Sequence, residues 1–246
     1  MSPLVVKIGG SLWRSALLDR WVAALRGYPG EMTIVPGGGP FADAVRAAQP
    51  EMGFSNEAAH RMALLAMEQY GLALVDKFPG FALVDRPEEA TAAHAAGRIA
   101  VWRPSAMTLA AQVDASWEVT SDSLAAFYAR RSRAARLLLI KSADVEGGPS
   151  DLVDERFSEF VRGLEVFIAG PRALAGAEAI LAGGGVAGTR ARGAQPDENG
   201  SSSRIDTKIS TPSIVTTMRD AFGTGSKAPA CHIPNHSPAT ETKPPS

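Results

Sequence analysis

Two lysines lie at the ends of apolar runs that are typical of strands buried on both faces. Lys7 belongs to the run Leu4–Ile8, and Lys141 directly follows the run Leu137–Ile140. A buried lysine is costly unless it binds an anion, and here each lysine precedes a turn. An acidic turn, Thr120–Asp122, lies between them in the sequence. Together these groups predict a site that holds a polyphosphate.

A glycine turn follows the first lysine. Gly9 and Gly10 allow the backbone to approach a ligand closely, and the N–H groups at the helix start after Ser11 favour an anion. Lys7 adds a full positive charge to the same turn. The alternative is an ordinary tight turn beside a lysine whose aliphatic stem alone is buried.

A second glycine turn, Gly37–Gly39, follows a predicted strand at Met32–Val35. With Ala42 it satisfies the G-x-G-x-x-A spacing of dinucleotide-binding folds, so a dinucleotide-dependent oxidoreductase is one alternative. That fingerprint expects an acidic residue at the end of a strand ~20 residues further on. The sequence predicts a helix there, over Ser55–Tyr70. The three glycines more simply form a cradle for a phosphate or carboxylate.

Other polar residues near these turns could have a structural role instead of binding a ligand. Thr120, Ser121 and Asp122 could simply cap the helix that follows them. Arg46 lies in the helix after the second glycine turn. His60 and Arg61 lie on the longer helix, where a partly buried structural histidine is as good an interpretation as a ligand-binding one.

Composition excludes several classes of protein. The chain has 246 residues, 45% of them hydrophobic, and a net charge of -1, so a nucleic-acid partner is not expected. One cysteine, Cys231, excludes a disulfide framework and a cysteine-based zinc site, and no metal site built from side chains is expected. We find neither a signal peptide at the start of the chain nor an apolar stretch that could span a membrane, and therefore expect a cytoplasmic protein.

Strands and helices alternate through residues 1–192, which predicts one α/β domain with a mainly parallel sheet covered by helices on both faces. Ligands of such sheets bind beyond the carboxyl ends of the strands, where the turns above lie. Residues 193–246 are rich in Ser, Thr, Pro, Asn and Gly, and we expect a mostly disordered tail with at most a helical turn or two at Ser213–Phe222. Further strands are predicted at Arg98–Trp102 and Leu164–Ile168, and helices at Leu17–Leu25, Phe41–Ala48, Ser121–Arg131 and Pro171–Leu181.

Four segments in this order resemble the amino acid kinase superfamily, which includes acetylglutamate, carbamate, uridylate and isopentenyl phosphate kinases. They are Lys7–Ser11, Gly37–Gly39, Thr120–Asp122 and Lys141–Gly147. The P-loop pattern and the protein-kinase signatures are absent. The resemblance extends from Val5 to about Arg190, near Gly188-Thr189. The part of the chain after Gly147, which the resemblance places on the nucleotide side, is compact.

The resemblance implies a three-layer αβα sandwich and a role for each segment. Lys7 would bridge the transferring phosphoryl group, with N–H donors from Gly9 and Gly10, and Lys141 would lie on the nucleotide side. Asp122 would hold both lysines in place. The donor would be ATP with Mg²⁺ held chiefly by phosphate oxygens. The implied nucleotide and phosphate side comprises Gly9, Gly10, Ser11, Ser142, Asp144 and Gly147, and the implied acceptor side comprises Gly37, Gly38, Gly39, Arg46, His60, Arg61, Thr120 and Ser121.

Two further segments, Trp117–Ser123 and Glu57–Ala63, resemble small kinases of one-carbon cofactor pathways. The implied reaction converts [5-(aminomethyl)furan-3-yl]methyl phosphate, an intermediate of methanofuran synthesis, to its diphosphate. The alternatives are another small acceptor, such as uridylate, isopentenyl phosphate or acetylglutamate, and a non-catalytic anion-binding protein on the same fold. A homo-oligomer is expected because closed dimers are the commonest assembly.

Overall fold

A computed structural model describes residues 3–144, 153–183 and 215–217 of the chain. Seven strands of these residues form a single sheet in the order β3-β4-β2-β1-β5-β6-β7. Neighbours from β3 to β6 pair in parallel, and β7 is antiparallel to β6. The strands are β1 (Leu4–Ile8), β2 (Met32–Pro36), β3 (Phe81–Val84), β4 (Ile99–Trp102), β5 (Arg136–Ile140), β6 (Glu165–Ala169) and β7 (Val215–Thr217).

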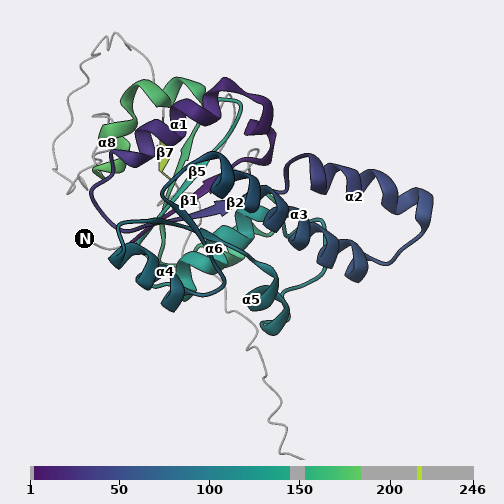
Figure 1. The fold of residues 1–246 in the computed structure, drawn as a ribbon. Coiled ribbons are helices and arrows are strands. Elements are labelled where there is room, and N and C mark those ends of the chain that lie inside the picture. Colours follow the sequence, from purple (N-terminus) through teal and green to yellow (C-terminus); the bar gives the residue numbers. More distant parts are fainter. Residues whose placement is uncertain (1–2, 145–152, 184–214, 218–246) are drawn as a thin grey trace, which may run out of the picture.

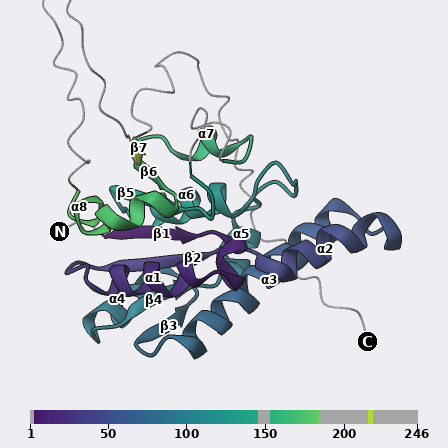
Figure 2. The same cartoon turned by 90° about the horizontal axis from the view of Figure 1, so that it is seen from above.

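Helices cover both faces of this sheet, so the predicted three-layer αβα architecture is confirmed (Figures 1 and 2). The α-helices are α1 (Ala16–Arg26), α2 (Gly39–Met52), α3 (Asn56–Lys77), α4 (Pro87–Ala95), α5 (Ser105–Ala110), α6 (Ser121–Arg131), α7 (Phe157–Phe160) and α8 (Ala177–Leu181). Two 3₁₀ helices, η1 (Gly10–Arg14) and η3 (Pro171–Gly176), follow β1 and β6.

The central strand β1 divides the core into two parts. Side chains of successive strand residues point to opposite faces of a sheet. Leu4, Val6 and Ile8 accordingly belong to a cluster with α1 and α8, whereas Val5 belongs to a second cluster with α4, α6 and α7. Lys7 is on the same face as Val5 and is buried, at 5% exposed. The sheet therefore delivers a lysine to its carboxyl edge beneath helix α6.

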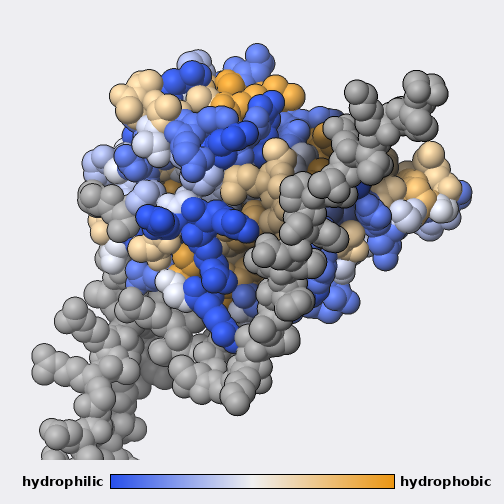
Figure 3. Space-filling model, turned by 90° about the horizontal axis from the view of Figure 1, so that it is seen from below, coloured by the Kyte–Doolittle hydropathy of each residue, from blue (hydrophilic) through white to orange (hydrophobic). Residues whose placement is uncertain are grey.

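Helices α2 and α3 pack against each other, and α2 projects from the body of the molecule (Figures 1 and 2). Large hydrophobic side chains are exposed on this pair, among them Met52, Leu65 and Leu72. The view from below shows hydrophobic residues among hydrophilic ones over the body and on this projection (Figure 3). None of the helices in residues 3–144 and 153–183 is long and apolar enough to cross a membrane.

The structure contains elements that the sequence analysis did not predict, among them strand β3 and helices α4, α5 and α7. We expected a mostly disordered tail with at most a helical turn or two at Ser213–Phe222, whereas Val215–Thr217 forms β7 against the edge of β6. The rest of residues 193–246, and the expected boundary at residue 192, lie outside the described residues.

Candidate active site

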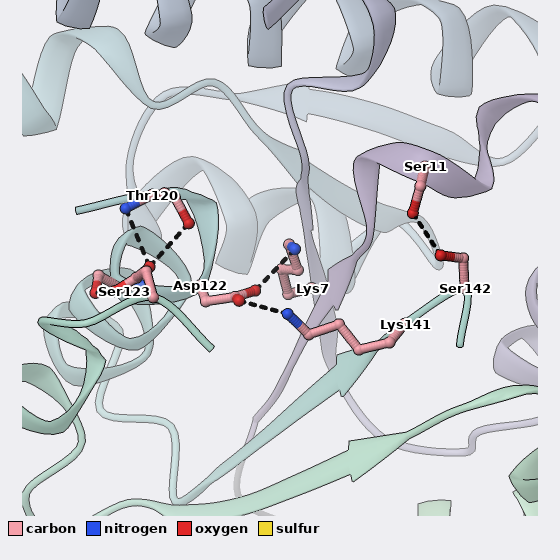
Figure 4. Close-up of polar contacts among 8 residues, drawn as sticks. Lys7, Ser11, Thr120, Asp122, Ser123, Lys141 and Ser142 are labelled. Carbon is pink, nitrogen blue, oxygen red and sulfur yellow. Dashed lines mark hydrogen bonds and ion pairs between the residues drawn. The ribbon is translucent and has the colours of Figure 1, made fainter. Parts of the chain in front are cut away.

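Three charged side chains from separate elements meet at the carboxyl edge of the sheet (Figure 4). Lys7 lies on β1, Lys141 directly follows β5, and Asp122 lies in the first turn of α6. The Lys7 Nζ is 2.7 Å from one oxygen of Asp122, and the Lys141 Nζ is 2.5 Å from the other. Because β1 and β5 are parallel neighbours, their ends bring the lysines together and α6 places the carboxylate between them.

The three charged side chains are largely buried, which strengthens the electrostatic interactions among them. The side chains of Lys7 and Asp122 are 6% and 5% exposed, and that of Lys141 is 16% exposed. Burial acts to raise the pKa of the Asp122 carboxyl, but the two ammonium groups outweigh it and hold the pKa below its ordinary value. Burial, together with repulsion from Lys7, lowers the pKa of Lys141 despite the attraction of Asp122. The trio has a formal charge of +1, which an anionic ligand would offset.

The two glycine turns contact each other through their backbones. A Cβ added at Gly10 would lie 2.5 Å from the Gly39 N, and one added at Gly37 would lie 2.4 Å from the Gly10 N. Gly39 has a φ of 55°, a conformation that favours glycine. Close approach at Gly10 and Gly37 is therefore required by the packing of the turns on one another, in addition to any ligand.

Two of the expected N–H donors already have partners within the protein. The Gly9 N–H donates to the Ile140 carbonyl at 2.9 Å, and the Gly37 N–H donates to the Ile8 carbonyl at 2.9 Å. The expected bond from Gly9 to a transferring phosphoryl group would compete with that contact. Gly9 thus ties the first turn to the end of β5, which carries Lys141.

The turn after Lys141 is joined to its neighbours by side-chain contacts. Ser11 donates a hydrogen bond to Ser142 at 2.7 Å, which brings these two predicted phosphate-side residues together (Figure 4). Asp144 accepts a hydrogen bond from the Arg172 N–H at 2.9 Å and forms an ion pair with that side chain. Asp144 therefore supports the start of η3 in this structure. Gly147 and the segment around Gly188-Thr189 lie outside the described residues.

A cavity of about 90 Å³ opens beside the acidic turn, between α2, α3 and the segment before α6. Thr120 and Ser121 line it, next to Asp122 in the chain, and Gly38 lines it from the second glycine turn. Apolar side chains such as Ala63 and Met67 form much of the remaining wall. The cavity therefore lies between the second glycine turn and the residues that directly precede Asp122.

Two further predicted acceptor-side residues, His60 and Arg46, line this cavity, and Arg61 does not. His60 is buried, and its Nε2 has no hydrogen-bond partner among the described residues. Burial lowers the pKa of His60, so its ring is neutral near pH 7. Arg46 also lines the cavity and lies over the Trp117 ring at 4.5 Å. Arg61 instead is exposed and pairs with Glu57 one helical turn away.

Two site features were missed by the sequence interpretation. Trp117 donates to Gln49 at 2.7 Å, which ties the wall of the cavity to α2. Asp154 accepts hydrogen bonds from Thr120 and Ser123 at the start of α6. No local pattern marks Asp154, because its partners are more than 30 positions away in the chain.

Solved structures that the fold resembles include uridylate kinases. The one from Archaeoglobus fulgidus matches with a TM-score of 0.57 and 15% identity, over 74% of this chain and 96% of that one. The UMP kinase from Ureaplasma parvum matches with a TM-score of 0.54 and 13% identity, over 70% of this chain and 90% of that one. The sheet, its helices and these neighbours define the amino acid kinase fold.

A curated relative agrees with this class. The [5-(aminomethyl)furan-3-yl]methyl phosphate kinase of Methanocaldococcus jannaschii is 30% identical over 151 residues. The match spans 58% of this chain and 66% of the relative, just under two thirds of its length. No protein-family model matches the chain. The fold agrees with the resemblance to the amino acid kinase superfamily that the sequence motifs predicted.

Proposed function

We propose that this protein is an ATP-dependent phosphotransferase that adds a phosphoryl group to a small phosphate monoester. The observation that carries the proposal is the buried cluster of Lys7, Asp122 and Lys141 at the carboxyl edge of the sheet. Phosphoryl transfer needs alignment and stabilisation of negative charge more than it needs a strong base. Two ammonium groups with one carboxylate between them meet that need.

The chain's own groups divide the work in this mechanism. Lys7, beside both glycine turns, would contact the oxygens of the transferring group, and Lys141 would stabilise charge on the departing diphosphate. Asp122 would keep both ammonium groups in place and would not act as a base, since its pKa is lowered. An acceptor phosphate oxygen forms the new bond to the γ-phosphorus as the bond to the leaving ADP oxygen breaks.

The described residues suit a magnesium ion that is held through the substrate. They contain no cluster of three His, Cys, Asp or Glu side chains that could bind a metal. Mg²⁺ prefers to keep water and phosphate oxygens as ligands, and when bound it neutralises phosphate charge. We keep Mg²⁺ in the proposal as a partner of ATP.

We propose [5-(aminomethyl)furan-3-yl]methyl phosphate as the acceptor. The activity named for the M. jannaschii relative supports this choice. So does the cavity, whose small, largely apolar walls suit a flat ring. The neutral, unpartnered Nε2 of His60 and the guanidinium of Arg46 offer polar contacts to an acceptor there.

Particular features of the chain distinguish the proposed function from the alternative functions. The dinucleotide interpretation lacks its acidic strand end, because the chain after α2 continues into helix α3. Uridylate, isopentenyl phosphate and acetylglutamate remain the other acceptors to compare. The combination of Lys7, Asp122 and Lys141 favours catalysis over a non-catalytic anion-binding protein on the same fold, because transfer requires charge to be stabilised on both the transferring and the departing group.

The oligomeric assembly and the cellular location of the protein are also part of the proposal. The exposed hydrophobic side chains of α2 and α3, including Leu65 and Leu72, suit contact with a second copy of the chain. We therefore retain a homo-oligomer as the expected assembly. A cytoplasmic location fits an ATP-dependent reaction and a chain with one cysteine.

A panel of acceptors tests the substrate. The protein is incubated with ATP, Mg²⁺ and, separately, [5-(aminomethyl)furan-3-yl]methyl phosphate, uridylate, isopentenyl phosphate, acetylglutamate or carbamate, and kcat/KM is compared. We expect the furan phosphate to have the highest value. A preference for uridylate or isopentenyl phosphate would refute the furan assignment, and a preference for acetylglutamate or carbamate would also refute a phosphate acceptor.

A further inference from the structure

A carboxylate outside the catalytic cluster makes four contacts with the start of helix α6. Oδ2 of Asp154 accepts hydrogen bonds from the Thr120 N–H at 3.0 Å, the Thr120 hydroxyl at 2.9 Å and the Ser123 N–H at 3.0 Å. Its Oδ1 accepts a further bond from the Ser123 hydroxyl. Thr120 and Ser123 lie on either side of Asp122 in the same turn (Figure 4). The backbone of Asp122 is thus fixed from both directions.

These contacts replace the local cap that α6 lacks. The first N–H groups of a helix have no partner within the helix, and a side chain usually supplies one. Thr120 occupies the capping position, but its side chain makes no capping bond among the described residues. Asp154 supplies the acceptors instead, and its negative charge suits the positive end of the helix dipole. The start of α6 therefore depends on a residue that is distant in the sequence.

The segment that carries Asp154 is itself well anchored. Arg156 pairs with Asp114 at 2.5 Å and with Glu159 at 2.7 Å. Phe157 is fully buried in the core cluster that includes α6. Contacts other than the hydrogen bonds it accepts from α6 thus also hold the segment around Asp154 in place.

We propose that Asp154 is a positioning residue, which holds the first turn of α6 so that Asp122 stays between Lys7 and Lys141. Both oxygens of Asp122 are engaged at 2.7 Å or less, so a small movement of this turn would lengthen at least one ion pair. The kinetic part of the inference rests on the proposed function, whereas the geometric part does not.

Two substitutions separate the hydrogen bonds of Asp154 from its charge. Asp154→Ala removes all four acceptor contacts. Asp154→Asn removes the charge, but its amide oxygen can take the place of Oδ2 and keep three of them. Its amide N–H₂ would then face the Ser123 hydroxyl, which can rotate to accept a hydrogen bond. A positioning role predicts that the asparagine variant recovers most of what the alanine variant loses.

Glu68→Ala provides a matched control. The Glu68 carboxylate accepts a hydrogen bond from the Ser105 N–H at 3.0 Å, so it caps α5 from a distant position much as Asp154 caps α6. Neither α5 nor Glu68 lines the cavity or contacts the charged cluster. We expect Glu68→Ala to lower the melting temperature and to leave turnover unchanged.

Kinetics test the functional part of the proposal. We expect Asp154→Ala to lower kcat by ~10–100-fold, as a misplacement of about 1 Å can do, with KM values for ATP and acceptor within about twofold of the original. Ser123→Ala, which removes one contact, should show a smaller loss and serves if the alanine variant fails to fold. An unchanged kcat in the folded variants, or an Asp154→Asn variant as slow as Asp154→Ala, would overturn the positioning role.

Crystal structures of the same variants test the geometry without any need for turnover. We expect Asp122 to separate from at least one lysine in Asp154→Ala, or to shift toward that state in Ser123→Ala, and to keep both ion pairs in Asp154→Asn. Intact ion pairs in every variant would overturn the proposal. A protein that is inactive with all acceptors, but whose Asp122 moves as expected, would refute the proposed function alone.

Discussion

Asp122 balances two buried positive charges with a single carboxylate. Without Asp122, Lys7 and Lys141 would face each other in a buried environment, where unpaired charges are costly. With it, the trio keeps one unit of positive charge at the edge where an anionic ligand would bind. In the proposed mechanism the same three side chains therefore serve both the stability of the protein without ligand and the stabilisation of a phosphoryl group.

The two lysines can be tested individually. We expect Lys7→Ala and Lys141→Ala each to lower kcat by ~10²–10³-fold, comparable to the loss of an oxyanion donor. In the proposed mechanism the first removes a charge beside the transferring group, and the second removes a charge beside the departing diphosphate. Lys77→Ala is the control, since Lys77 pairs with Asp19 at 2.7 Å on the surface. Steady-state kinetics give kcat for each variant, and near-normal turnover by a folded variant would remove that lysine from the mechanism.

The pH dependence of turnover follows from the lowered pKa of Lys141. Burial and repulsion from Lys7 favour the neutral amine, so this side chain loses its proton at a lower pH than a free lysine does. Because the mechanism needs the charged form, kcat/KM for ATP should decline with rising pH below the ordinary lysine pKa of ~10.4. A profile of kcat/KM, which reports the free protein, measures this limb. A plateau that extends beyond ~10.4 would contradict the role of Lys141.

At the scale of elements, the site is built where two glycine turns and one helix start meet. Apolar runs and turn residues predicted β1, β2 and α6, because those signals are local. Gly10 contacts the second glycine turn, and Asp154 accepts hydrogen bonds from the start of α6. Both contacts join segments that are remote in the sequence. No single-sequence pattern reports such pairs, which is why the motif residues were found and their supports were not.

The contact between the glycine turns can be tested by adding one methyl group. In Gly10→Ala the new Cβ would lie 2.5 Å from backbone, so the turns must separate, and we expect a loss of ~1–3 kcal/mol in the free energy of unfolding. Gly71→Ala is the matched control within α3, where the nearest atoms are side chains at 3.4 Å. That control should be neutral or slightly stabilising. Denaturant unfolding compares them, and equal stability of the two variants would contradict the packing argument.

At the scale of the whole molecule, a strand from beyond residue 192 completes the sheet. Composition alone favoured a tail without structure, and β7 departs from that expectation because backbone pairing to β6 needs little from the side chains. The edge of β6 would otherwise present unpaired N–H and C=O groups. The extent of the domain is therefore better judged from sheet pairing than from composition.

Truncation tests the contribution of β7. A chain that ends at Arg192 loses this strand and several backbone hydrogen bonds, each with a net value of ~0.5–1.5 kcal/mol. We expect its melting temperature to fall by about 3–10 °C. A chain that ends at Phe222 keeps β7 and should melt close to the full-length protein. Identical melting of all three would show that β7 adds no stability.

We propose that the lysine–aspartate cluster promotes the transfer of a phosphoryl group from ATP to a phosphate acceptor. The most direct measurement is a ³¹P NMR spectrum of the protein with ATP, Mg²⁺ and [5-(aminomethyl)furan-3-yl]methyl phosphate, recorded beside the Lys7→Ala variant. We expect the acceptor monoester signal to be replaced by coupled signals of a new diphosphate as ADP appears, with strongly reduced conversion by the variant. A monoester signal that persists while ATP is hydrolysed, or equal conversion by the variant, would contradict the account.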